Sequence, residues 1–258
     1  MLTFTDEQLD WLVARLPISE RNPKGGRPEA DRRRTLQGIF WILDNGEMER
    51  PPAPVRKQKH RSSLVPNLDH GRRVRAHPAR GRPVRRARGG YKLYECYIDA
   101  TFAKAKGGGD GIGCTKAGKG VKIMVLVDAR GLPVAVETMS AAPHESRLAQ
   151  GLFDFMLTTQ MPLRVIGDKA YDSDALDQAA RAGRCGIDRA HRSNRKSENI
   201  TQDGRPLRRY KRRWIAERTI SWIQNFRRLC IRWEKTTPLF QGFLHLGCTL
   251  LLLRVVLG

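Results

Sequence analysis

The sequence YECYIDAT, residues 94–101, is the first of three stretches that decide the fold; the others are GVKIMVLVDARG (120–131) and LPVAVETMS (132–140). All three are rich in Val, Ile, Tyr or Thr, which favour strands. Turn residues from Asp128 to Gly131 separate the second stretch from the third. The three stretches therefore predict three antiparallel strands, the first of which ends on Asp99.

Predicted helices and strands alternate after these strands. Two short apolar segments, LRVIGD (163–168) and CGIDRAH (185–191), predict strands, and the first ends on Asp168. Apolar residues at helical spacing predict three helices, at residues 144–157, 173–184 and 207–229. Three antiparallel strands followed by this alternation is the order of an RNase H-like fold, an α/β class with a mixed sheet and flanking helices.

Two further helices are predicted near the N-terminus. TFTDEQLDWLVARL (3–16) opens with a capping pattern at Thr5, and DRRRTLQGIFWILDNG (31–46) ends on an Asn-Gly stop signal. We assign residues 1–46 to a small helical region. Two short helices with a basic connection could bind DNA or could be a plain packing unit.

Residues 47–90 differ in composition from the rest of the chain. Arg and Pro dominate, and no helical or strand period is sustained. Such sequence cannot build its own core, which predicts a disordered linker or a basic arm that wraps DNA. A third hypothesis is that compensating frameshifts near Gly46 and Gly90 produced this segment, because GC-rich DNA translated in a wrong frame gives sequence rich in Arg, Pro, Ala and Gly.

The overall charge points to a polyanionic partner. The 258 residues carry a formal net charge of +22, and nucleic acid is the usual partner of such a chain. The N-terminus has acidic residues where a secretory signal needs basic ones, so we expect a cytoplasmic, nucleoid-associated protein. The apolar stretch 239–257 is interrupted by Gln241, His245 and Arg254, which predicts a buried helix and no membrane span.

Three carboxylates form a candidate metal site. Asp99 and Asp168 follow apolar strands, and Glu217 lies in the basic helical segment 207–229. Neighbouring strands could bring the two aspartates together, and carboxylate oxygens are the ligands that Mg²⁺ prefers. Taken singly, the three acids could equally be a strand-end turn residue, a helix cap and a solvated helix acid.

The predicted helix places polar residues beside Glu217. At about 100° per residue, Tyr210, Arg213, Glu217 and Gln224 share one face. Arg213, one turn before Glu217, could contact a phosphate or hold the carboxylate, and Tyr210 could position a DNA strand.

The motifs together resemble a known family. The chain resembles the DDE transposases of bacterial insertion sequences, family four or five type, in five stretches. They are YIDATFAKAKGGGDGIGCTKAGKGVKIMVLVD (97–128), GLPVAVETMSAAPHE (131–145), VIGDKAYDSD (165–174), HRSNRK (191–196) and YKRRWIAERTISWIQNFRRLCIRWEK (210–235). These transposases carry a Tyr-Arg-Glu signature around the last acid. The resemblance covers residues 91–258, which we assign to an RNase H-like catalytic domain, and residues 26–46 look like the N-terminal region of the same family.

The resemblance implies roles for individual residues. Asp99, Asp168 and Glu217 would be the catalytic triad that binds Mg²⁺ or Mn²⁺, and Tyr210 and Arg213 would complete the signature. Gln224 departs from the Lys or Arg of many relatives, and His144 and Glu145 match a motif without an assigned role. Further DNA contacts would come from two basic segments: Lys104, Lys106, Lys116, Lys119, Arg192, Asn194, Arg195 and Lys196.

The implied activity is Mg²⁺-dependent cleavage at the ends of an insertion sequence, followed by strand transfer into target DNA. DNA would be the partner, and a homodimer would handle two ends together. Residues 47–90 do not look like the matching part of the family, which supports the frameshift hypothesis and allows a decayed, inactive copy. A hydrolytic nuclease of the same fold would cut DNA without joining it. The charge alone would also suit a non-enzymatic basic nucleic-acid-binding protein.

Overall fold

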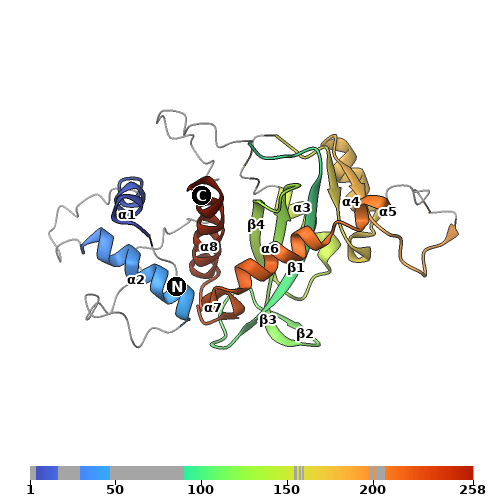
Figure 1. The fold of residues 1–258 in the computed structure, drawn as a ribbon. Coiled ribbons are helices and arrows are strands. Elements are labelled where there is room, and N and C mark those ends of the chain that lie inside the picture. The colour runs from blue at the N-terminus through green and yellow to red at the C-terminus, as the bar shows by residue number, and fades with distance from the viewer. Residues whose placement is uncertain are drawn as a thin grey trace.

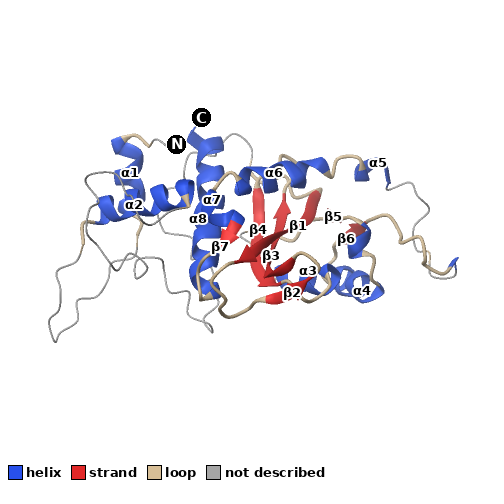
Figure 2. Cartoon of the chain, turned by 90° about the horizontal axis from the view of Figure 1, so that it is seen from below, coloured by secondary structure: helices blue, strands red, loops and turns tan. Residues whose placement is uncertain are grey.

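A computed structural model describes residues 4–16, 30–46, 90–153, 156, 158, 160–197, 200 and 207–257 (Figure 1). Apart from Gly90, the Arg/Pro-rich segment 47–90 lies outside the described residues, and so do the predictions made for it. In the described part, a twisted sheet lies at the centre with helices on both of its faces (Figures 1 and 2).

The central sheet has a mixed topology. Its strands are β1 (Cys96–Ala105), β2 (Gly113–Thr115), β3 (Gly118–Val127), β4 (Pro133–Ser140), β5 (Arg164–Ile166), β6 (Gly186–Asp188) and β7 (Ile231–Arg232). β4, β3 and β1 are antiparallel neighbours, and β5 and β6 continue the sheet parallel to β1. This arrangement confirms the predicted α/β class, and the order β4-β3-β1-β5-β6 is that of an RNase H-like sheet.

β1 is longer than the sequence predicted. The expectation that the first strand ends on Asp99 is wrong, because β1 continues to Ala105 and pairs with β3 from Tyr97 through Lys104. Beyond Asp99 the chain still alternates between the two sheet faces, and Ala103 is buried. The glycine-rich segment after β1 also contains β2, which the sequence did not predict.

The prediction of one long helix over residues 207–229 is also wrong. The segment forms three helices, α5 (Leu207–Tyr210), α6 (Trp214–Gln224) and α7 (Arg227–Cys230). Between α5 and α6 the backbone bonds tighten to i→i−3, as in Arg213 N–H to the Tyr210 carbonyl. Phe226 adopts an extended backbone conformation and buries its ring, which interrupts the helix after α6.

The remaining helices form two layers against the sheet. α3 (Glu145–Phe153) and α4 (Asp174–Ala182) cover one face, where Ile98, Met124 and Leu126 are buried. α6 and α8 (Thr237–Leu257) cover the other, and α8 buries Phe240, Leu244 and Leu250, as the prediction of a buried helix in this segment requires. Among the described helices, none combines the length and hydropathy that crossing a membrane requires.

The N-terminal helices join the second of these layers. α1 (Asp6–Val13) begins with the predicted capping box at Thr5, and α2 (Arg32–Asn45) ends at Gly46, whose φ is 75°. α2 packs against α7, and Arg228 Nη1 donates to the Gly46 carbonyl at 3.2 Å. In both ribbon views α8 stands between these two helices and the sheet (Figures 1 and 2).

Candidate active site

The three acidic residues come from three neighbouring elements. Asp99 lies within β1, on the sheet face that α6 covers, and Asp168 follows β5, the parallel neighbour of β1. Glu217 lies in the first turn of α6, which packs across β1 and β3. The two aspartates thus come from neighbouring strands, but neither is the last residue of its strand. The prediction that the second strand ends on Asp168 is wrong, because β5 ends on Ile166 and Asp168 caps the short 3₁₀ helix Lys169–Tyr171, accepting from the Ala170 N–H at 2.8 Å.

The three carboxylates are electrostatically coupled. Burial raises the pKa of Asp99 to about 6, and the charges of Asp168 and Glu217 contribute to the increase, against the lowering effects of the Ala100 N–H and Arg213. The Ala100 N–H donates to Asp99 Oδ1 at 2.8 Å. The site therefore holds an excess of negative charge that the protein only partly neutralises.

Arg213 connects two of the acids. Its Nη2 donates to Glu217 Oε1 at 2.9 Å, and its Nη1 lies 3.8 Å from Asp168 Oδ2. Nη1 also donates to the Tyr210 hydroxyl at 3.3 Å, and the guanidinium lies 4.9 Å from the centre of the Tyr210 ring. Tyr210, Arg213 and Glu217 are thus brought together as predicted, even though the helix carrying them is interrupted.

The donor set fits a hard divalent cation. Three carboxylates offer only oxygen ligands, and the pKa of Asp99 is raised mainly because burial removes the water that would stabilise its charge. In the described part of the chain, no group of three or more Asp, Glu, His or Cys side chains is close enough to hold one ion. Glu217 is already bound by Arg213.

Gln224 forms a link that the sequence did not predict. Its Nε2 donates to the Thr101 hydroxyl at 2.8 Å. Thr101 lies two residues after Asp99 on the same face of β1, and Gln224 lies two turns after Glu217 on α6. The bond therefore ties the strand of one acid to the helix of another. Only the position of Gln224 on the Glu217 face could have suggested it.

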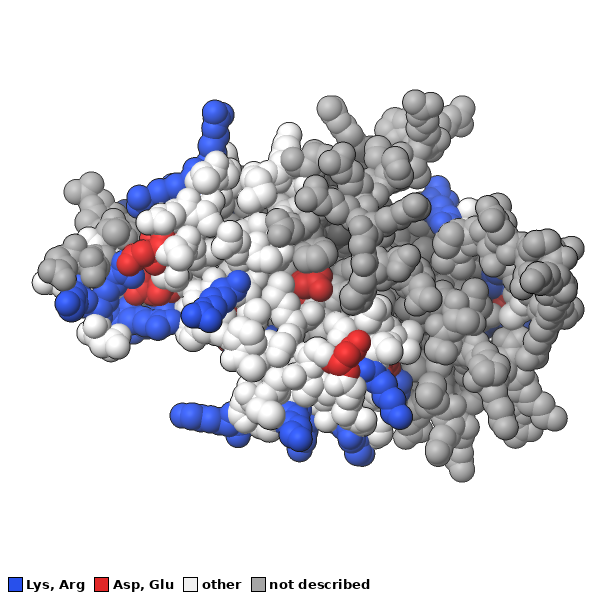
Figure 3. Space-filling view, turned by 180° about the vertical axis from the view of Figure 1, so that it is seen from behind, with Lys and Arg blue, Asp and Glu red and all other residues white. Residues whose placement is uncertain are grey.

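The predicted basic residues form two groups. Lys104, Lys106, Lys116 and Lys119 are all exposed, at the far end of β1 and on the β2–β3 hairpin. Lys106 Nζ lies 4.3 Å from the centre of the Trp233 ring. Viewed from behind, Lys and Arg side chains project along the lower edge of the molecule (Figure 3). The lysines are therefore separated along the sheet from the acidic residues.

The second basic group is engaged with the protein itself. Arg195 Nη1 donates to Asp172 at 2.6 Å and also contacts Asp174, and Arg192 binds the carbonyls of Lys169 and Ala170. Asn194 and Lys196 are exposed. The two arginines thus shape the segment, while the other two side chains face solvent.

His144 and Glu145 acquire contacts in the structure. His144 Nε2 lies 2.9 Å from Arg192 Nη2, and Glu145 Oε1 lies 3.4 Å from Lys122 Nζ. His144 therefore connects the start of α3 to the segment after β6. Its contact with Arg192 explains a polar motif for which the sequence gave no role.

A buried ion network beside the site was not predicted. Arg189 is fully buried and binds Asp172 and Asp177, and Asp172 also accepts from His191 and the Arg192 N–H. Burial alone would raise the pKa of Asp172, but these donors lower it overall. The acids and arginines are too far apart in sequence for spacing to reveal their pairing.

Comparisons with known proteins identify the family of the chain. A family model described as "Transposase DDE domain" matches residues 91–252. The chain is 32% identical over 144 residues to the putative transposase for insertion sequence element IS402 of Burkholderia cepacia, covering 53% of this chain and 64% of that relative. It is 31% identical over 137 residues to the putative transposase for IS6501 of Brucella ovis, covering 52% of this chain and 98% of the relative.

The chain therefore spans less than two thirds of the IS402 relative. Among solved structures, a piggyBac transposase synaptic complex with hairpin DNA aligns with a TM-score of 0.43 at 9% identity, covering 63% of this chain and 48% of that one.

Proposed function

Because the chain belongs to the family of transposase DDE domains, we propose that it cleaves DNA at the ends of an insertion sequence and joins the freed 3′ ends to target DNA. The observation that supports the proposal is geometric: Asp99 lies on the face of β1 that α6 covers, and Arg213, just before α6, contacts both Asp168 and Glu217. Both reactions are attacks of an oxygen on a phosphodiester, by water in cleavage and by the 3′-hydroxyl in joining. One acidic site can serve both.

Family membership implies the use of a divalent metal, and we take it to be Mg²⁺, with Mn²⁺ as a substitute. When bound, such ions lower the pKa of the attacking oxygen and stabilise the leaving oxygen. Asp99 and Asp168 would hold the metal, with Glu217 joining them. Burial of Asp99 excludes part of the water that would otherwise screen its charge.

Arg213 and Tyr210 have a positioning role in this proposal. The guanidinium of Arg213 is placed to exchange its contact with Glu217 for a phosphate oxygen of the DNA. Tyr210 holds the guanidinium from one side. The exposed lysines on the β2–β3 hairpin and the segment 192–196 would contact phosphates farther along the DNA.

The proposed partners are the terminal repeats of the element and a target DNA. Two ends must be handled together for the element to be joined at both sides, so we propose a homodimer on DNA. Residues 1–46 would contribute to end recognition.

The test is cleavage of DNA that carries the ends of the chain's own element. The purified chain is incubated with Mg²⁺ or with EDTA, alongside Asp99→Asn, which removes the charge and keeps the shape. Metal-dependent nicking at the ends that disappears in the variant supports the proposal. Salt-sensitive binding without nicking by the parent chain overturns it and favours a non-enzymatic binder or a decayed copy.

A further inference from the structure

The outer surface of α6 carries two exposed tryptophans. Trp214 is 51% exposed and Trp222 is 37% exposed, and Arg218 lies between them at helical spacing. The Arg218 guanidinium lies 4.9 Å from the ring centre of Trp214 and 4.8 Å from that of Trp222. We call these three residues the Trp–Arg–Trp ladder.

Arg218 is fixed by contacts other than the tryptophans. Its Nη2 donates to the Arg130 carbonyl at 2.6 Å, in the turn between β3 and β4. A Cβ at Gly131 would lie 2.8 Å from the same nitrogen. The glycine therefore allows the turn to approach the Arg218 guanidinium closely. Each indole is thus held against Arg218 on one side, while a large part of its surface stays in contact with water.

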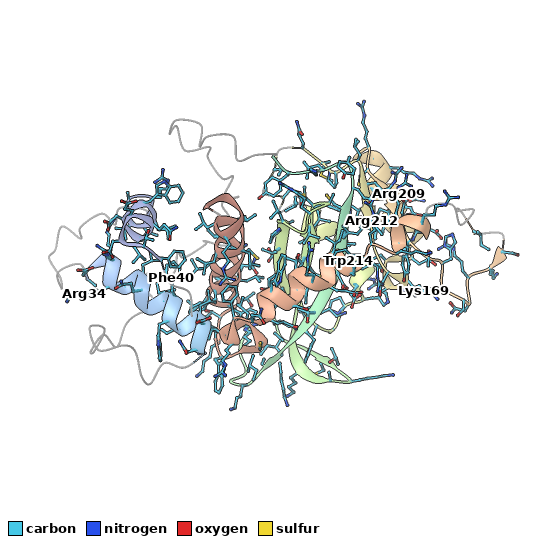
Figure 4. The ribbon with its side chains drawn as sticks, in the orientation of Figure 1. Arg34, Phe40, Lys169, Arg209, Arg212 and Trp214 are labelled. Atoms are coloured by element: carbon cyan, nitrogen blue, oxygen red, sulfur yellow. The ribbon has the colours of Figure 1, made fainter. Side chains whose placement is uncertain are left out.

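The ladder is adjacent to the acidic residues. Arg218 directly follows Glu217, so at about 100° per residue it lies on the neighbouring flank of the same helix. Trp214 follows Arg213, which binds Glu217 and approaches Asp168. Arg209, Arg212 and Trp214 succeed one another along α5 and the start of α6 (Figure 4). Arg209 and Arg212 are ion-paired with Glu95, so the positive charge that the ladder itself presents is that of Arg218, at its centre.

We infer that the Trp–Arg–Trp ladder is a stacking platform for unpaired DNA bases next to the reacting phosphodiester. Exposed aromatic rings beside arginines stack bases of any sequence, and the arginines attract the phosphates between them. A second copy of this chain is a poorer occupant, because it also carries a net charge of +22 and would present like charge to Arg218. The inference rests on the proposed function, since it places the platform beside the cleavage site.

The test measures DNA binding in EDTA, where no cleavage occurs. Fluorescence anisotropy gives the affinity of the full chain for an element end with a short single-stranded flank and for the same end fully paired. Trp214→Ala and Trp222→Ala should weaken binding of the flanked DNA about five- to hundredfold and leave the paired DNA unchanged. Trp214→Phe and Trp222→Phe, which retain a ring, should bind like the parent.

Trp11→Ala is the matched control. Trp11 is 42% exposed and has Arg15 stacked at 3.5 Å, but it lies on α1, on the far side of α8 from the sheet. Loss of an end-recognition contact from residues 1–46 would weaken binding of both DNAs alike, so the ratio of flanked to paired affinities of Trp11→Ala should equal that of the parent. Circular dichroism and the melting temperature of each variant identify loss of folding, and a misfolded alanine variant is replaced in the comparison by Trp214→Ser or Trp222→Ser.

Two results would overturn the platform. One is an unchanged affinity ratio in folded Trp214 and Trp222 variants. The other is a loss that accompanies conversion of a dimer to a monomer in sedimentation without DNA, which assigns the ladder to an interface between copies. Mg²⁺-dependent nicking by the parent is measured separately. If the parent nicks DNA and the tryptophan variants keep its ratio of flanked to paired affinities, the platform alone is rejected. If the parent does not nick DNA and the variants lower this ratio, the proposed function alone is rejected.

Discussion

Asp99 shows how function and stability oppose each other at a single residue. Its carboxylate is largely buried, accepts a hydrogen bond from its neighbour's N–H, and faces two other acids. A site that attracts a divalent cation needs negative charge that the protein does not fully compensate. When no cation is bound, this buried charge lowers the stability of the folded chain. Arg213 offsets part of that cost by bridging Asp168 and Glu217.

Asp99→Asn should therefore separate activity from stability. We expect cleavage to fall at least about 100-fold, the scale of removing one charged group from a reaction centre. In EDTA at neutral pH the free energy of unfolding should rise by about 1–2 kcal/mol. The raised pKa of Asp99 means that the folded state disfavours its charged carboxylate, and asparagine removes that charge. Urea unfolding measures the change. Asp110→Asn is the control of opposite sign, since Asp110 accepts hydrogen bonds from Arg232 and Thr237 and its loss should destabilise.

Asp172 should contribute a pH-dependent part of the stability. Its pKa is below the ordinary value of 3.8 in the folded chain, so the folded state favours the charged carboxylate. This contribution is fully present at neutral pH and is lost as pH falls below about 4 through the folded value. Asp172→Asn should cost about 3 kcal/mol at pH 7, because Arg189 and Arg195 lose a charged partner. Unfolding curves should show that the difference in the free energy of unfolding between variant and parent is smaller at pH 3 than at pH 7. An equal difference at both pH values would contradict this assignment.

At the scale of elements, the sequence predicted which segments become strands better than where helices end. β3 follows from a largely apolar run and β4 from an alternating one, and the turn at Asp128 to Gly131 separates them. The helical period of residues 207–229 continues through the breaks, so it could not reveal that Phe226 leaves the helix to bury its ring. Asp99 and Asp168 were predicted to be site residues because each follows a short apolar run. The Thr101–Gln224 bond depends on tertiary packing, which local sequence does not encode.

That bond should set the position of α6 relative to β1. Gln224→Ala should lower the cleavage rate about tenfold and the free energy of unfolding by about 1 kcal/mol, the usual value of one hydrogen bond. Thr101→Val removes the other partner and should have the same effects. The double variant should be no worse than either single one. Additive losses in the double variant would show that the two side chains act independently.

At the scale of the whole molecule, one hydrophobic core joins the N-terminal helices to the sheet. Leu36, Phe40 and Leu43 of α2 belong to the same buried cluster as Val125 of β3 and Phe240 of α8. The buried ion pair of Arg228 with Glu234, at 2.7 Å, and the bond from Arg228 to Gly46 reinforce the contact of α2 with α7. Residues 30–46 therefore fold as part of the same unit as the sheet.

Leu43→Ala tests this unity. Leu43 is fully buried, so the substitution should lower the free energy of unfolding by about 3 kcal/mol. If α2 and the sheet share one core, urea unfolding should remain a single transition, shifted by the same amount when followed by circular dichroism or by tryptophan fluorescence. Trp41→Ala, a partly buried neighbour on the same helix, should shift the transition less. Two separate transitions, with only one moved, would show that the helices fold independently.

The location of α8 has a consequence for how the protein is made. This helix is synthesised after every other described element, yet it lies between α1 and α2 on one side and the sheet on the other. During translation, α2 and the strands emerge from the ribosome with their apolar surfaces lacking the layer that Phe240, Leu244 and Leu250 supply. A growing chain cannot complete this core until α8 has left the ribosome. Folding of the site-bearing sheet is thereby postponed until α8 has been synthesised, and the apolar surfaces that stay exposed until then favour aggregation of the unfinished chain.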